Sequence, residues 1–104
     1  MISLHEPEIT EKDQKTVLKS LRSGWVSISG KGKFVKKFED KISKFCKVKY
    51  VLATNSGTSS LFLALKIAGV KKNHEVIVPT ITFIAPINAV SYNGATPIFM
   101  DSDD

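Results

Sequence analysis

The 104-residue sequence predicts one α/β domain built on a mainly parallel sheet. Three short apolar runs, at residues 50–54, 75–79 and 97–100, have the composition of strands, and two apolar-periodic segments between them have helical character. This alternation is the pattern of two right-handed crossover units. Ligands of such sheets bind beyond the carboxyl ends of the strands. Those ends fall at residues 55–59, 80–83 and 101–104.

Two helices are expected before the first strand. Thr10 followed by Asp13 is typical of a capped helix start, and Gly24 suits the left-handed residue after a helix. The second helix is predicted from Lys33, because apolar residues then recur at intervals of four, four and three. We expect this stripe to belong to the core; its members are Phe34, Phe38, Ile42 and Phe45.

The segment between these helices, residues 24–32, is rich in Gly and Ser and carries the single tryptophan, Trp25. We expect a loop. A tryptophan there either fills a local gap or contacts a ligand, and the residues leave both interpretations open. The run Gly30-Lys31-Gly32-Lys33 lacks the full Walker spacing and follows no strand, so no nucleotide-binding P-loop is predicted.

The formal net charge of +5 lies in the first half, because residues 1–49 hold twelve of the fifteen Lys and Arg but six of the ten acids. A basic patch can bind nucleic acid or an anionic substrate. We interpret it as a solvated helix face and expect no nucleic-acid partner. Stacking on bases requires aromatic rings on the charged face, whereas here the two kinds of side chain lie opposite.

The sequence indicates a cytoplasmic protein without a membrane partner. No apolar run approaches the roughly 18 to 20 residues of a membrane span, and the first residues lack the pattern of a signal peptide. One cysteine, Cys46, cannot build an internal disulfide framework, and we expect it to be a buried structural thiol. No metal site is expected at His74, because no second ligand follows at a suitable spacing.

The stretch from Tyr50 to Leu65 predicts an anion site. A strand stops at Asn55-Ser56-Gly57, and a helix over about Thr58–Ala68 begins at once with small hydroxyl residues in its first turn. The free N–H groups and the positive end of the helix dipole would face the space beyond the strand, and Gly57 would let a ligand approach the backbone. A phosphate suits this arrangement.

The second half of the chain continues the alternation. Residues 75–79 are apolar without alternation, as in a parallel strand that is covered on both faces. An apolar helical stretch is then predicted after Phe83 and up to Tyr92, with Pro86 tolerable in its first turn, and Asn93-Gly94 closes it.

Taken together, several motifs resemble the DegT/StrS family of PLP-dependent aminotransferases, which act on nucleotide-linked keto-sugars. The matching motifs, in order, are Ser23-Gly24-Trp25, Ser29-Gly30, Phe38-Glu39, Asn55 to Leu61, Glu75 to Pro79, Thr82-Phe83, Gly94 to Pro97 and Asp101. The resemblance implies the N-terminal part of the aspartate-aminotransferase-like (type I) PLP large domain, a three-layer α/β/α fold with a mainly parallel sheet. Residues 1–104 would form a single incomplete domain, with N-terminal helices and a substrate-side loop in residues 1–49 and the start of the large domain in residues 50–104.

The same resemblance implies roles for individual residues. Positions Gly57, Thr58 and Ser59 would bind the phosphate of pyridoxal 5'-phosphate (PLP), and Phe83 would stack on its pyridine ring. The substrate side of the cleft would be bordered by Trp25, Ser29 and Gly30. The chain departs from the family pattern at His74, where Asp is usual, and at Ala85-Pro86, where Ala-Thr is usual; only local geometry is put in doubt.

No catalytic residue is assigned, because the strand-end loops contain no lysine to form the Schiff base with PLP. Lys66 lies eight residues after Thr58, about 12 Å along a helix, and cannot reach. We therefore expect the Schiff-base lysine beyond the end of this chain, and the 104 residues alone to be inactive and marginally stable.

The full-length enzyme is expected to move an amino group, from glutamate, to a nucleotide-linked keto-sugar in cell-surface polysaccharide or related amino-sugar biosynthesis, as a homodimer. The alternatives are a PLP-dependent sugar dehydratase of the same family, with histidine in place of the lysine, and a non-catalytic module that binds a phosphorylated ligand.

Overall fold

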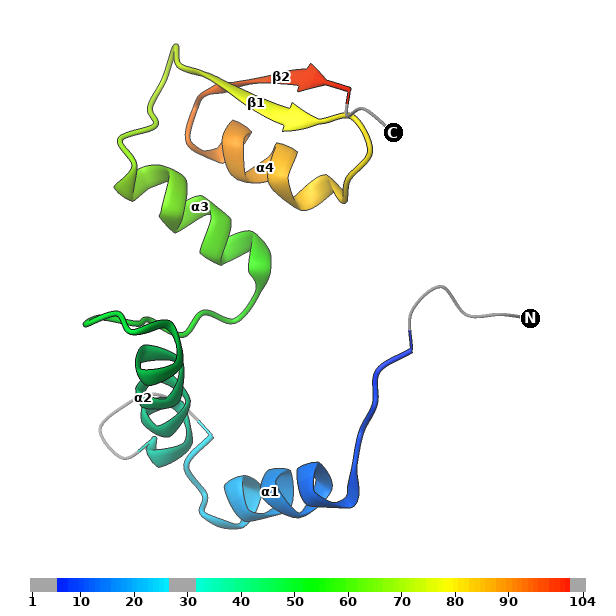
Figure 1. The fold of residues 1–104 in the computed structure, drawn as a ribbon, viewed down its shortest axis with the longest axis vertical. Helices are drawn as coiled ribbons and strands as arrows, with labels where there is room; N and C mark the ends of the chain where they lie inside the picture. The colour runs from blue at the N-terminus through cyan, green and yellow to red at the C-terminus, as the bar shows by residue number, and fades with distance from the viewer. Residues whose placement is uncertain (1–5, 27–31, 102–104) are drawn as a thin grey trace. The chain divides into compact units, whose positions relative to one another are not determined.

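The computed structural model describes residues 6–26 and 32–101. It divides into two compact units, Met1–Ala53 and Thr54–Asp104 (Figure 1). The Ser29 and Gly30 positions of the expected substrate-side loop lie outside the described residues. None of the helices within the described ranges is both long and apolar enough to cross a membrane.

The first helix, α1 (Glu11–Arg22), begins with the predicted capping box. The Thr10 hydroxyl oxygen accepts from the Asp13 N–H at 3.3 Å, and the Asp13 carboxylate accepts from the Thr10 hydroxyl at 2.6 Å and from its N–H at 2.9 Å. These hydrogen bonds, led by the hydroxyl, hold the pKa of Asp13 below its ordinary value. The cap is therefore strongest when Asp13 is ionised, and it weakens as pH falls through the pKa of the folded state. Gly24 follows the helix at φ +70°, as predicted.

The second helix, α2 (Lys33–Cys46), starts at the predicted residue and ends at Lys47 in the left-handed region. The expectation that its apolar stripe belongs to the core is wrong, because α2 has no buried residue. Phe38 is 53% exposed and Phe45 is 86% exposed, and Phe34 and Ile42 are half-buried. Cys46, expected to be buried, is exposed as well. The physical reason is that α1, the other helix of this unit, does not pack extensively against α2. The apolar face of α2 is therefore only partly covered within its own unit.

The apolar run at residues 50–54 is extended but forms no strand, which corrects a second prediction. Tyr50 and Leu52 are 79% and 69% exposed. An extended segment becomes a strand only when a neighbour supplies hydrogen bonds, and no segment in the described ranges pairs with it. The end of this extended segment is nevertheless attached to α2, because the Ala53 N–H donates to the Glu39 carboxylate at 2.9 Å.

The second unit contains α3 (Gly57–Ile67), β1 (Glu75–Pro79), α4 (Ile84–Tyr92) and β2 (Thr96–Met100). The two strands are parallel and pair from Glu75↔Thr96 to Pro79↔Met100, with α4 as the connection between them (Figure 1). This confirms the predicted crossover unit in residues 75–100. Pro86 is the third residue of α4, where its missing N–H costs little.

The core of this unit lies between α4 and one face of the sheet. Its buried members are Val78, Val90 and Ala95, with Leu65, Val70, Val76 and Ile87 packed against them. The opposite face is open: Ile77 is 66% exposed, although the uniformly apolar strand predicted cover on both faces. Successive side chains of a strand point to opposite faces, and the described elements of the unit cover only one of them.

Gly94 closes α4 at φ +74°, and this position yields a stability prediction. A Cβ added here would meet Lys72 at an ordinary 3.5 Å, so the cost comes from the backbone conformation alone. We expect Gly94→Ala to lower the free energy of unfolding by about 1–2 kcal/mol, and Gly94→Asn by less, because Asn tolerates the left-handed region. Denaturant unfolding of the intact protein measures both changes.

The matched control is Gly57→Ala, where φ is not positive and the added Cβ meets nothing within 4 Å. It should leave the free energy of unfolding unchanged or raise it by up to about 1 kcal/mol, because Ala restricts the unfolded chain more than Gly does. If Gly94→Ala is as stable as the unmodified protein, the backbone at this position does not need the left-handed conformation, and the prediction is wrong.

Candidate functional site

The start of α3 is capped in a way that leaves two backbone donors free. Ser56 is the N-cap residue, and its hydroxyl oxygen accepts from the Ser59 N–H at 3.2 Å. Its carbonyl accepts from the Ser60 N–H at 3.1 Å. The remaining N–H groups of the first turn, on Gly57 and Thr58, have no acceptor among the described residues. They can bind a ligand without breaking an existing hydrogen bond.

The hydroxyl groups around this turn form a network that holds the loop. The Ser59 hydroxyl donates to the Asn55 side-chain carbonyl at 2.9 Å and lies 3.0 Å from the Ser56 hydroxyl. Thr54 donates to the Ser56 carbonyl at 3.0 Å and shares a hydrogen bond with the Ser60 hydroxyl. In the described part of the chain, the Thr58 hydroxyl has no such partner. It is therefore a third available donor beside the two N–H groups.

The electrostatics of the loop favour an anion. The first turn of α3 contains no acidic side chain, and the helix dipole adds partial positive charge at the same point. The space next to Gly57 is open, since an added Cβ would find no atom within 4 Å. A phosphate monoester has three acceptor oxygens, which suit the two N–H groups and one hydroxyl. The predicted anion site is thus supported by the donors that the loop leaves unused.

Sequence reasoning missed how these donors are divided. It placed Thr58 and Ser59 in the same role, whereas the structure engages both donors of Ser59 within the loop. It also gave Thr54 and Asn55 no function, although their side chains hold the turn. A serine N-cap followed three residues later by a second serine was the signal that could have indicated this.

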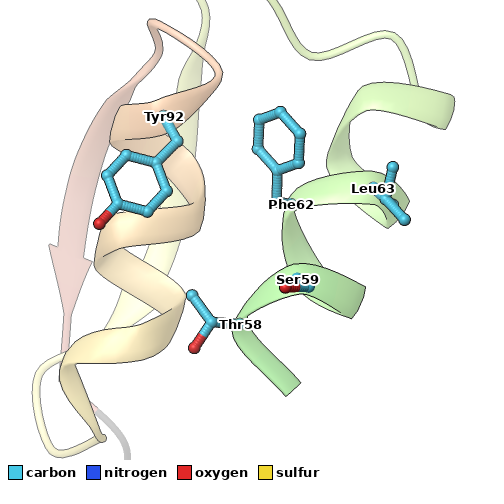
Figure 2. Close-up of a pocket in the computed structure, with 5 residues that line it drawn as sticks. All are labelled: Thr58, Ser59, Phe62, Leu63 and Tyr92. Atoms are coloured by element: carbon cyan, nitrogen blue, oxygen red, sulfur yellow. The ribbon is translucent and has the colours of Figure 1, made fainter. Parts of the chain in front are cut away.

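The structure brings Phe83 to the same end of the second unit as this loop. Both views show α3 and α4 running in the same direction, so that their starts lie at one end, where β1 and β2 finish (Figures 1 and 2). Phe83 is the N-cap residue of α4 and is 87% exposed. The strand ends are joined by Thr80, whose N–H and hydroxyl each donate to the Met100 carbonyl at 2.9 Å.

A pocket of about 520 Å³ lies between α3 and α4, beside the start of α3 (Figure 2). The rings of Phe62 and Tyr92 form its apolar walls, and the hydroxyl residues lie nearest the start of α3. Its lining residues are Thr58, Ser59, Phe62, Leu63 and Tyr92.

Two further residues singled out in the sequence, Trp25 and His74, are each described within their own unit. Trp25 belongs to the first unit and is 42% exposed, and its N–H donates to the Ser23 hydroxyl at 3.2 Å. His74 is a turn residue, as expected, with its N–H on the Lys71 carbonyl and its own carbonyl accepting from Thr96. Within residues 6–26 and 32–101, no group of three His, Cys, Asp or Glu side chains is placed to hold a metal ion.

The parallel pair β1–β2, joined through α4, makes this unit an α/β structure, and the unused donors at the start of α3 make that helix start its candidate ligand site. The profile of the DegT/DnrJ/EryC1/StrS aminotransferase family matches residues 7–104, and the chain belongs to that family. This confirms the resemblance inferred from the motifs.

Individual relatives agree over nearly the whole chain. It is 45% identical to a GDP-perosamine synthase of Escherichia coli O157:H7 over 99% of its own length and 28% of the relative's. It is 40% identical to the spore coat polysaccharide biosynthesis protein SpsC of Bacillus subtilis over 94% of its length and 24% of that protein. The chain therefore spans about a quarter of the length of the curated relatives it matches.

Solved structures confirm the fold class. The PLP form of the putative sugar aminotransferase Spr1654 from Streptococcus pneumoniae superposes with a TM-score of 0.81 at 33% identity, covering 98% of this chain and 25% of that one. An aminotransferase from Psychrobacter cryohalolentis gives a TM-score of 0.82 at 35% identity, covering 93% of this chain and 24% of that one. The chain has the fold of the N-terminal part of these aminotransferases.

The capping geometry predicts that two substitutions at Ser56 differ in their effect on stability. Ser56→Ala removes the acceptor of the Ser59 N–H and should lower the free energy of unfolding by about 1 kcal/mol. Ser56→Asp retains an N-cap acceptor and should leave it nearly unchanged. Denaturant unfolding followed by circular dichroism measures both, with Ser91→Ala, an exposed residue of α4, as the control. A Ser56→Asp variant as unstable as Ser56→Ala would contradict the capping role.

Proposed function

We propose that the intact protein is a PLP-dependent aminotransferase that moves an amino group, from glutamate, to a nucleotide-linked keto-sugar. The observation that carries the proposal is the set of unused donors at the start of α3, in a chain that belongs to a sugar aminotransferase family. Relatives named for GDP-, dTDP- and UDP-linked sugars support the substrate class. The name of the relative SpsC supports a place in polysaccharide biosynthesis.

In this proposal the start of α3 binds the cofactor phosphate. The N–H groups of Gly57 and Thr58 and the Thr58 hydroxyl donate to its oxygens, and the helix dipole stabilises its charge. Ser59 lies beside them and can join once its hydroxyl proton turns away from Asn55. Donors that are fixed before binding lose little entropy when the anion arrives.

Phe83 supplies the second contact of the proposed cofactor site. Its exposed ring lies at the start of α4, at the same end of the unit as the phosphate donors, and offers a flat apolar surface to a pyridine ring. PLP, when bound, acts as the electron sink of the reaction. The described side chains of this chain bind and orient it. We assign a catalytic role to none of them, since residues 55–59 and 80–83 contain no lysine.

The proposal extends to the substrate side and to assembly. Trp25, Ser29 and Gly30 are proposed to border the nucleotide-sugar, on the strength of the family resemblance, and a homodimer is proposed as the working state. The exposure of Trp25 is compatible with a ligand contact.

The activity is tested on the intact protein with PLP, ¹⁵N-glutamate and a nucleotide-linked keto-sugar, with mass spectrometry of the product. We expect an amino-sugar nucleotide that carries the label. A product that has lost a hydroxyl group and gained no nitrogen would indicate the dehydratase alternative, and binding of PLP without turnover would indicate a binding module.

The proposed phosphate site predicts unequal effects of two hydroxyl substitutions. Thr58→Val removes an unengaged donor at nearly constant shape and should weaken PLP binding about ten- to hundredfold, because hydrogen bonds to charged groups contribute about 1.5–3 kcal/mol. Ser59→Ala removes a hydroxyl that already donates to Asn55 and should weaken binding less. Titration of the visible absorption of bound PLP measures both. If Thr58→Val binds PLP as tightly as the unmodified protein, the assignment of Thr58 is wrong.

A further inference from the structure

Asn93, the residue that ends α4, makes the one side-chain hydrogen bond between α3 and α4 in the described residues. Its amide nitrogen carries two protons and has two acceptors: the carbonyl of Ala89 in its own helix, at 2.9 Å, and the carbonyl of Phe62 in α3, at 3.2 Å. The side chain is partly buried. Both donors of the amide are therefore satisfied, one in each helix.

This bridge acts on α3 close to the phosphate donors. Phe62 lies one helical turn after Thr58, so the two side chains share a face of α3, and both line the pocket (Figure 2). The apolar side chains packed between the two helices limit sliding by their shape, but the hydrophobic effect itself is non-directional. A hydrogen bond to a single carbonyl has a defined length and direction. The Asn93 amide therefore adds a directional constraint on the position of α3 along the axis of α4.

The position of α3 along the axis of α4 sets the distance between the two proposed cofactor contacts, the Thr58 donors and the Phe83 ring. The Thr58 donors lie at the start of α3, and Phe83 lies at the start of α4, and the two helices run in the same direction (Figures 1 and 2). Any slip between the helices would change the distance from the phosphate donors to the ring platform.

We propose that Asn93 is a positioning residue for the cofactor: its amide bridge sets the relation between the Thr58 phosphate donors and the Phe83 ring. The inference rests on the proposed function. It requires an amide at this position, because a carboxylate would present oxygen to two carbonyl oxygens and repel both.

The test compares two ligands of the intact apo-protein, PLP and inorganic phosphate, well below the unfolding temperature of each variant. PLP contacts both helix starts, whereas phosphate contacts only α3. We expect Asn93→Asp to weaken PLP binding about tenfold and to change the visible circular dichroism of bound PLP, while phosphate binding stays within about twofold. Ser91→Ala, two residues earlier and exposed, should change neither. Asn93→Leu removes the bridge without adding charge and answers the same question if the Asp variant fails to fold.

Each result decides one point. Unchanged PLP binding in both Asn93 variants would overturn the positioning role, and so would equal weakening of PLP and phosphate, which is what general loosening of α3 would produce. Absence of PLP binding by the unmodified protein would overturn the proposed function, and the role of Asn93 with it.

Discussion

The capping of α3 by Ser56 is the interaction on which the candidate site depends. A helix start exposes N–H groups that need acceptors, and one residue here supplies two, through its hydroxyl and its carbonyl. The cap therefore stabilises the first turn of α3, and it also determines which backbone N–H groups remain without an acceptor. Gly57 and Thr58 keep free N–H groups because the acceptors of Ser56 are directed at Ser59 and Ser60.

The rest of the second unit holds this turn in place. The buried side chains of Val78, Val90 and Ala95 join α4 to the sheet, and α3 packs on α4. The parallel pairing of β1 and β2 brings the strand ends to one edge, where the starts of both helices also lie. The same geometry explains why one amide, on Asn93, can influence two contacts at the far end of the helices. Packing holds the helices together there, and the Asn93 hydrogen bond adds a directional contact to that packing.

Predictions that depended on neighbouring residues in the chain were confirmed, and several that depended on distant partners were wrong. The cap at Thr10, the start of α2 at Lys33, and the left-handed glycines at 24 and 94 all follow from short stretches of sequence. The strand at residues 50–54, the burial of Phe45 and the cover over Ile77 each require a partner segment, and the described residues supply none. An apolar pattern identifies a surface that needs cover without identifying what covers it.

The sequence by itself determined the four helices, the strands at residues 75–79 and 96–100, the capped start of α3 and the family, because periodicity, caps and motifs can be read along the chain. The tertiary structure alone decided that Ser59 is engaged while Thr58 is free, that Phe83 shares an end with the turn, and that Asn93 joins two helices. These depend on distances between groups that the sequence does not specify. A hydroxyl or an amide acquires its role from the acceptor that the fold places within hydrogen-bonding distance.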